Sequence, residues 1–222
     1  MPRLLSTQTM HSMVFSLNFV SRFLAAILIG FLSACATSPE MATSSSSAVP
    51  DNWENRLNHL HQLQTWSVYG KIGVRSPKQS DSAVINEWNQ TGDSFRIKLS
   101  SALLGIGTTV LEGSENELFI IHSDGQIVHS HHPGQLLHEQ TGWRLPLASI
   151  PFWIKGIPSP EASYSITFDN QGNPHTIIQS GWHITPGRYK KITDLYLPGK
   201  IVISDTQNKI TLIIAQWILP HS

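Results

Sequence analysis

The feature that most constrains the fold of this chain is a period-two alternation of apolar and polar side chains. Two segments, 65–75 and 94–100, carry the alternation clearly. Their apolar members are Trp66, Val68, Ile72, Val74, Phe95, Ile97 and Leu99. Because successive side chains of a β-strand point to opposite faces of its sheet, this period predicts strands with one buried face.

Short connections rich in turn-forming residues separate such segments. Thr91-Gly92-Asp93 links the segment 83–90 to 94–100, and Ser123-Asp124-Gly125 joins a later pair. Strands joined by so few residues pair antiparallel. Leu212-Ile213-Ile214 is apolar on both faces, which predicts packing on each side of the last strand. Further extended segments are predicted at 164–169, 176–184, 195–197, 200–204 and 209–217.

Three helices are predicted beside these strands. The first spans about residues 53–64, and Asp51 begins a capping pattern in front of it. The second covers 133–142 and is closed by a glycine. The third covers 147–155, where Pro151 must lie near the first turn or kink the helix. The combination indicates a mainly β (α+β) domain.

The amino-terminal region is typical of an exported lipoprotein. Arg3 and Arg22 precede an apolar run at 23–32, which has the length of a signal peptide and is short for a membrane span. The run ends in Leu32-Ser33-Ala34-Cys35, which resembles a lipobox. We expect cleavage before Cys35, which then carries a diacylglycerol and an N-acyl group. The alternative is an ordinary secretory signal with a cysteine near the cut by chance.

These features divide the chain into three parts. Residues 1–34 are predicted to be a signal peptide, 35–50 a flexible tether, and 51–222 one folded domain. The residue after Cys35 is alanine rather than aspartate, which in bacterial lipoprotein sorting favours the outer membrane. We therefore expect a lipid-anchored protein on the periplasmic face of the outer membrane of a Gram-negative bacterium.

Composition excludes several classes of function. Lys plus Arg equal Asp plus Glu at 15 each, and no basic stripe is present, which argues against nucleic-acid binding. The chain has one cysteine, so no disulfide forms within it. The stretch 105–110 begins like a dinucleotide loop but lacks its third glycine, and no nucleophile elbow is present. We expect neither a cofactor nor an enzyme.

A group of histidines admits a metal-binding interpretation. His129, His131 and His132 lie close in sequence, and His129 and His131 share one strand face. No carboxylate or thiolate at a recognisable spacing completes a ligand set. We therefore favour solvated histidines and predict no functional metal, while a metal-binding lipoprotein stays open as an alternative.

Three large aliphatic residues interrupt a connection where turn chemistry normally selects polar residues. Leu103, Leu104 and Ile106 lie among serines and glycines between two predicted strands. One interpretation is that they fold back onto the core. On a protein tethered to a bilayer, an exposed apolar tip can instead insert into lipid or contact a lipidated client.

At this point the chain resembles the LolB family of outer-membrane lipoprotein receptors over most of residues 53–218. The resemblance rests on the order of several short motifs. In chain order they are Glu87-Trp88-Asn89-Gln90-Thr91-Gly92, Phe95-Arg96-Ile97-Lys98-Leu99, Leu104-Gly105, Thr141-Gly142 with Leu145-Pro146-Leu147, and Phe152-Trp153-Ile154-Lys155-Gly156-Ile157-Pro158. Leu103 departs from the proline often found before the loop leucine, and Ile106 adds a further apolar side chain.

The resemblance implies an incomplete, strongly curved antiparallel β-barrel whose apolar concave face is covered by helices. It implies a pocket there for the acyl chains of lipoproteins delivered by a LolA-like periplasmic carrier. Trp88, Phe95, Trp153 and Trp182 are our candidates for the pocket wall. Leu104, flanked by Leu103 and Ile106, is the candidate for insertion into outer-membrane phospholipid. We expect a monomer, and an outer-membrane scaffold protein is the remaining alternative.

Overall fold

In a computed structural model of the protein, residues 46–100, 107–160 and 162–220 are described. They belong to one compact unit, Thr43–Ser222. Cys35 and the three loop residues Leu103, Leu104 and Ile106 lie outside the described residues, as do residues 1–34, the predicted signal peptide.

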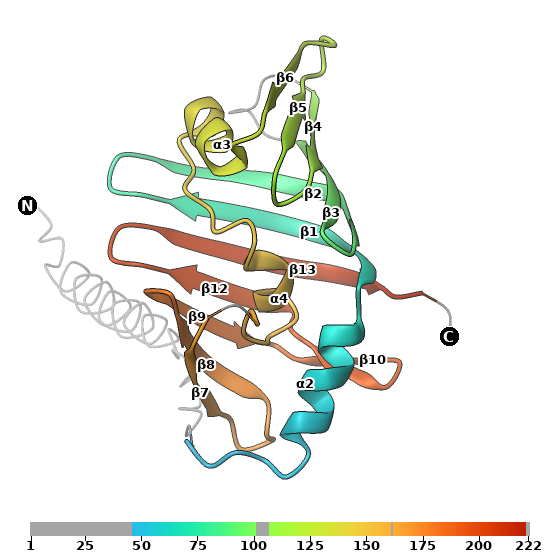
Figure 1. Ribbon diagram of the computed structural model, residues 1–222, viewed down its shortest axis with the longest axis vertical. Coiled ribbons are helices and arrows are strands. Elements are labelled where there is room, and N and C mark those ends of the chain that lie inside the picture. The colour runs from blue at the N-terminus through green and yellow to red at the C-terminus, as the bar shows by residue number, and fades with distance from the viewer. Residues whose placement is uncertain (1–45, 101–106, 161, 221–222) are drawn as a thin grey trace, which may run out of the picture. The chain divides into compact units, whose positions relative to one another are not determined.

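About half of the described residues form antiparallel strands (Figure 1). The strands are β1 (Thr65–Arg75), β2 (Ser80–Thr91), β3 (Ser94–Ser100), β4 (Thr108–Gly113), β5 (Leu118–Ile121), β6 (Ile127–Ser130), β7 (Tyr164–Phe168), β8 (Pro174–Gln179), β9 (Trp182–Gly187), β10 (Lys190–Ile192), β11 (Leu195–Leu197), β12 (Lys200–Ser204) and β13 (Lys209–Ile218). Eleven of them form one sheet in the order β6-β5-β4-β3-β2-β1-β13-β12-β9-β8-β7, and β10 pairs with β11.

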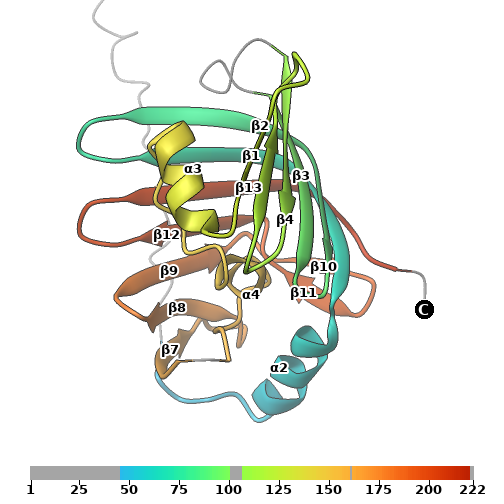
Figure 2. The same cartoon turned by 45° about the horizontal axis from the view of Figure 1, so that its top comes forward.

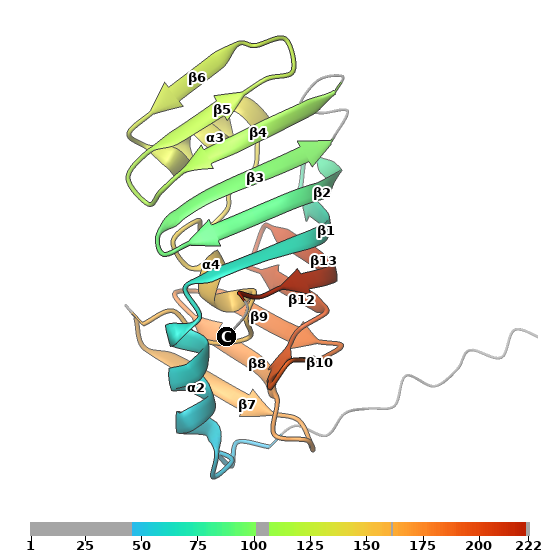
Figure 3. The same ribbon diagram turned by 90° about the vertical axis from the view of Figure 1, so that its right-hand side faces the viewer.

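The large sheet curls without closing. Its edge strands, β6 and β7, are not paired with each other, and Figure 3 shows the strands following one another as a curved ladder. Backbone hydrogen bonds join Ser46 and Phe168 in both directions, at 2.9 and 2.8 Å, so the chain before the first helix pairs with the β7 edge. The predicted open, curved antiparallel barrel is therefore confirmed.

Irregularities in three neighbouring strands bend the sheet near its middle. The pairing of β1 shifts register beside Gly70 against both β2 and β13, and β2 shifts between Ile85 and Glu87 against β3. In β2 the buried side chains have odd numbers up to Ile85 and even numbers from Trp88 onward. A bulge of this kind increases bending while keeping apolar side chains on one face.

Among the described residues, three helices accompany the sheet: α2 (Trp53–Gln62), α3 (Pro133–Thr141) and α4 (Ile150–Trp153). Figures 1 and 2 show α3 and α4 lying across the same face of the sheet, whereas α2 lies beside its lower end. We call the segment from the start of α3 to the end of α4, residues 133–153, the lid. It encloses the main core against the concave face of the sheet.

Several local predictions were wrong in their details. The segment 176–184 is two strands, because Ser180 and Gly181 adopt positive φ angles of 51° and 80° and turn the chain. The third helix is shorter than 147–155, although its proline does lie in the first turn. No capping side-chain hydrogen bond forms at the start of α2. Ile213 is half-buried rather than packed on both sides.

A buried glutamine attaches the end of the lid to the sheet. Gln179 Oε1 on β8 accepts hydrogen bonds from Trp153 Nε1 and from the Ser159 backbone N–H, both at 2.9 Å. Its Nε2 donates to the carbonyl oxygens of Ser159 and Ala162 at 2.7 and 2.8 Å. Because an amide offers two donors and two acceptor sites, this buried side chain is fully used.

A buried lysine attaches the same segment to α2. Lys155 Nζ donates hydrogen bonds to the carbonyl oxygens of Leu60 and Leu63, at 2.7 and 3.1 Å. These carbonyls belong to the end of α2, where a cation is favourable. Burial nevertheless lowers the pKa of Lys155 to about 8. Residues 150–159 are therefore held by polar contacts to both β8 and α2.

We expect Gly70→Ala to destabilise the sheet at its bend. A Cβ at position 70 would overlap the backbone carbonyl oxygen of Ile213, whereas at Gly73 on the same strand the nearest atom lies 3.8 Å away. Urea denaturation should show the free energy of unfolding lowered by about 2 kcal/mol or more for Gly70→Ala. It should change by less than about 1 kcal/mol for the control Gly73→Ala. Equal losses in the two variants would contradict this account of the bend.

The buried charge of Lys155 predicts a pH dependence of stability. Below pH 8 the ammonium is charged in both folded and unfolded chains. Between about 8 and its ordinary value of 10.5 the folded chain loses this proton first. Wild type should therefore gain about 1–3 kcal/mol relative to Lys155→Met as the pH rises through this window. Denaturation of both proteins at pH 7 and pH 10.5 measures the difference, and a constant difference would refute the burial of the charge.

Candidate functional site

An apolar cavity of about 50 Å³ lies between the concave face of the sheet and the lid. The sheet contributes side chains from β1 to β5 and from β13. These are Ile72, Ile85, Trp88, Gln90, Phe95, Ile97, Leu99, Leu111, Leu118, Ile210 and Leu212. The lid contributes Leu137, Trp143, Leu145, Leu147, Ile150 and Pro151. The site is therefore a hydrophobic interior with one wall made by a short, separate segment.

The polar groups in this wall are few. Gln90 Oε1 accepts a hydrogen bond from Trp88 Nε1 at 3.1 Å, and its Nε2 donates to the Gly92 carbonyl at 2.9 Å. Trp143 Nε1 is buried and has no hydrogen-bond partner among the described residues. An unpaired buried donor costs about 1–3 kcal/mol, so a ligand that offers an acceptor there would gain a hydrogen bond.

The cavity is too small for a fatty acyl chain in the conformation described. An enclosed apolar cavity of roughly 150 Å³ holds one benzene molecule, and an acyl chain is several times larger. The lining is nevertheless continuous and apolar on both walls. Displacing the lid would expose this lining, so the arrangement suits a site that opens for an apolar ligand.

The two ends of the lid are attached differently. Beyond α4, the contacts of Gln179 and Lys155 hold the chain to its surroundings. At the end of α3, Gln79 Nε2 from the β1–β2 hairpin donates a hydrogen bond to the Thr141 carbonyl at 3.2 Å. Gly142, with φ of 73°, ends this helix in the left-handed region, and the chain from 142 to 146 is irregular. The part nearest α3 is thus held mainly by apolar packing.

A second cavity of about 80 Å³ adjoins the first and is more polar. The two share Gln90, Phe95, Leu147 and Pro151 in their linings. The second also has Asp93 and Lys155 in its wall. The apolar interior therefore borders a polar region at the edge of the lid nearest α2.

The candidate pocket residues occupy different places. Trp88 and Phe95 line the apolar cavity. Trp153 is fully buried, and its ring centroid lies 6.3 Å from that of the half-buried Trp182 on β9. Neither of these two tryptophans lines the cavity.

Sequence inspection missed most of the lid side of the cavity. Trp143, Leu145 and Leu147 alternate with other residues between Gly142 and the start of α4. This spacing, bounded by a glycine and a proline, was the available signal for an extended apolar segment. The candidate loop residues Leu103, Leu104 and Ile106, and the candidate anchor Cys35, lie outside the described residues.

The histidine group does not take part in the cavity. Leu118 on β5 lines the cavity, so the next residue, Phe119, points to the outer face of the sheet. The ring of His129 stacks on Phe119 with centroids 4.1 Å apart.

Among the described residues, no helix is long and apolar enough to cross a membrane.

Comparisons with known proteins agree with the motifs. The family model described as outer membrane lipoprotein LolB matches residues 64–217. Outer-membrane lipoprotein LolB of Marinobacter nauticus is 32% identical over 199 residues, covering 86% of this chain and 94% of the relative. The protein of the same name from Chromohalobacter salexigens is 31% identical over 197 residues, covering 89% of this chain and 90% of the relative.

Among solved structures, a LolA superfamily protein from Nitrosomonas europaea aligns over 76% of this chain and 94% of its own, with a TM-score of 0.47 and 9% identity. The sequence matches favour neither the scaffold protein nor the metal-binding lipoprotein as the main role. The chain therefore belongs to the LolB family of outer-membrane lipoproteins and is not an enzyme.

Proposed function

We propose that this protein is an outer-membrane receptor that accepts lipoproteins from a LolA-like periplasmic carrier and delivers them into the membrane. The observation that carries the proposal is the apolar cavity between the concave sheet and the lid, in a chain of this family. The cavity lining takes up the acyl chains of the client, and no covalent bond forms or breaks. Binding and release are the whole reaction.

Loading requires the lid to move. We assign the motion to α3 and the irregular chain after it, because α4 is attached by the buried contacts of Gln179 and Lys155. Moving α3 breaks the hydrogen bond from Gln79 to the Thr141 carbonyl and removes the packing of Leu136 and Leu137 against the core. Acyl chains that replace these leucines against the sheet restore much of the buried apolar area.

One polar contact is available to the lipid inside this apolar site. The unpaired Nε1 of Trp143 donates to a carbonyl oxygen of an ester or amide that joins an acyl chain to the client. Such a bond adds orientation to an interaction that is otherwise non-directional. The acyl chains then enter with their carbonyl ends near the lid.

Net transfer needs a gradient of affinity and no nucleotide. The receptor binds acyl chains more tightly than the carrier does and releases them to the bilayer, which binds them more tightly still. Each step of about 1.4 kcal/mol changes an equilibrium tenfold. Differences of this size between neighbouring partners give one direction to the flow.

The receptor is placed at the membrane by the lipid on Cys35. Two or three acyl chains hold a protein on a bilayer, since each buried methylene contributes about 0.8 kcal/mol. The chain pairs with the sheet from Ser46 onward, so the tether between these residues reaches at most about 40 Å. The domain, a monomer in this proposal, therefore acts close to the periplasmic face of the outer membrane.

A charge placed in the cavity wall should weaken lipid binding. Ile97 on β3 lines the cavity and is only partly buried, so Ile97→Glu is expected to fold. Its carboxylate must be desolvated when an acyl chain enters, which should weaken binding of a fluorescent fatty acid at least tenfold. Fluorescence titration measures this affinity.

The matched control is Ile178→Glu, because Ile178 on β8 is 40% exposed and lies outside the cavity lining. It should bind the probe as wild type does, and circular dichroism checks that both variants fold. Unchanged binding by Ile97→Glu, or equal loss in both variants, would exclude the cavity as the lipid site.

The loop between β3 and β4 is the proposed delivery element. Leu104→Glu should leave folding and acceptance from the carrier intact but reduce delivery into liposomes, because a carboxylate at the tip disfavours insertion into lipid. Reconstituted transfer from a lipoprotein-loaded LolA-like carrier measures the two steps separately. Leu104→Met, which keeps the tip apolar, should deliver normally. Normal delivery by Leu104→Glu would refute the assigned role.

A further inference from the structure

We propose that Glu117, His129 and His131 form a binding site for a divalent transition-metal ion, with Zn²⁺ as the best match. The site lies on the outer face of the sheet, away from the lipid cavity. The carboxylate comes from the residue before β5, and the two imidazoles come from β6 and the residue after it. The sequence shows the two histidines, and the fold adds the carboxylate.

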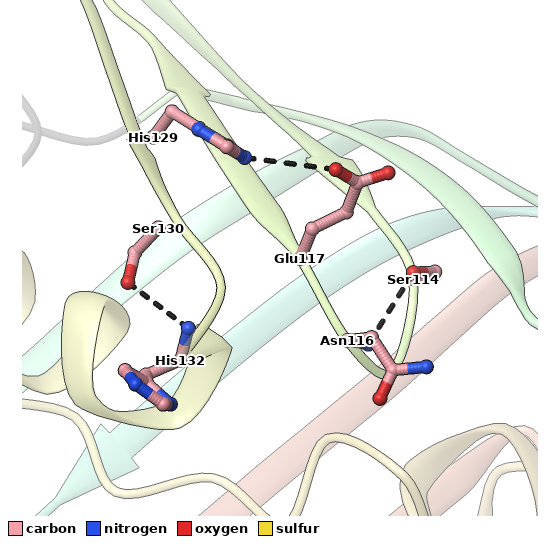
Figure 4. Close-up of polar contacts among 6 residues, drawn as sticks. All are labelled: Ser114, Asn116, Glu117, His129, Ser130 and His132. Atoms are coloured by element: carbon pink, nitrogen blue, oxygen red, sulfur yellow. Dashed lines mark hydrogen bonds and ion pairs between the residues drawn. The ribbon is translucent and has the colours of Figure 1, made fainter.

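The register of the two edge strands brings these residues together. Leu118 pairs with Ser130 and Phe119 with His129, so the antiparallel ladder places Glu117 opposite His131. Alternation along each strand puts all three side chains on one face. The ligand atoms of the three residues lie within 4.8 Å of one another. Figure 4 shows the carboxylate of Glu117 facing His129 Nε2, at 3.6 Å.

Ring contacts hold the imidazoles at this position. His129 stacks on Phe119, its cross-strand partner, with an interplanar angle of 16°. His131 meets the edge of His129 with centroids 4.8 Å apart and an angle of 79°. An aromatic stack orients the His129 ring without using either of its nitrogens, so Nε2 can face the Glu117 carboxylate and bind a metal ion.

The distances allow a metal ion after small side-chain movements. Bonds of about 2.0–2.1 Å in a tetrahedral site place ligand atoms roughly 3.3 Å apart. The three groups must therefore close by about 1.5 Å at most. The side chains of His129 and Glu117 are 35% and 44% exposed, and His131 is exposed, so they can rotate without disturbing the core.

The ligand types select the class of ion. Two imidazoles and one carboxylate suit Zn²⁺, Cu²⁺ or Ni²⁺, whereas Ca²⁺ and Mg²⁺ prefer oxygen ligands throughout. Arg96, which lines the same outer groove as Glu117, is ion-paired with Glu112 and so does not neutralise the Glu117 carboxylate. Three protein ligands leave a fourth position for water or for a group from another molecule.

Binding here would act on the lid from outside. His131 is two residues before Pro133, the first residue of α3. A metal bridge from Glu117 to His131 ties the chain that enters α3 to the neighbouring hairpin. Bound metal should therefore stabilise the edge of the sheet and the start of the lid together.

The experiment uses the full-length protein in detergent, purified without a histidine tag and without nickel resin. Calorimetric titration with ZnCl₂ should give one site per chain. At free Zn²⁺ about 100 times the dissociation constant, the melting temperature should rise by about 5 °C or more. MgCl₂ at the same concentration should change neither signal.

Variants locate the ion. Glu117→Gln and His129→Ala should each weaken Zn²⁺ binding at least tenfold. His132→Ala should not, because in Figure 4 the His132 side chain lies apart from Glu117 and His129. All three changes are on the surface, and circular dichroism verifies folding. Cobalt(II) provides a second measurement on the wild-type protein, since a four-coordinate site with histidine ligands gives a strong visible absorption band.

No uptake of Zn²⁺ by wild type would overturn the proposal. So would binding that is unchanged in both Glu117→Gln and His129→Ala, which would place the ion on other histidines. Cobalt(II) with the weak absorption of the free aqueous ion would also count against a protein-held site.

Discussion

An open sheet with an apolar concave face cannot stand alone in water, and the rest of this structure depends on that constraint. The concave face carries Ile72, Trp88, Leu99 and Leu212 among its buried side chains. A closed barrel would fill its interior with its own strands, but here β6 and β7 are not joined. A segment outside the sheet must therefore provide the missing wall, and a wall that is not hydrogen-bonded into a sheet can be displaced. In the proposed receptor, the contact between the lid and the sheet covers the core when it is closed and admits a lipid when it is open.

Buried polar contacts attach the lid at its α4 end, whereas mainly apolar packing attaches it at α3. This difference sets the end at which we propose that the lid opens. Gln179 makes four hydrogen bonds with the chain at and after α4. Lys155 donates hydrogen bonds to carbonyl oxygens at the end of α2. α3 contributes Leu136 and Leu137 to the core, contacts that an acyl chain can imitate. Polar contacts need particular partners at particular distances, whereas apolar contacts accept any surface of the right shape.

The sequence predicted the elements more reliably than their junctions. Alternation in 65–75 and 94–100 and the turn at Thr91–Asp93 identified the central strands, because one buried face forces a period of two. The turn at Ser180-Gly181 was missed, because the apolar residues on both sides of it are typical of one continuous strand. Trp88 and Phe95 were placed at the cavity wall by family motifs, but periodicity alone does not separate a filled core from a cavity. Glu117 could not be linked to His129 and His131, because strand register is not visible in sequence spacing.

The pairing of Ser46 with Phe168 bears on the risk of aggregation for a protein at a crowded membrane surface. A free strand edge recruits other edges, and tethering to a bilayer raises the chance of such encounters by confining molecules to two dimensions. Here the backbone just before α2 occupies part of the β7 border, while β6 at the far border is four residues long. In the proposed lipid-anchored protein, Ser46 therefore also blocks part of this edge against pairing with another sheet.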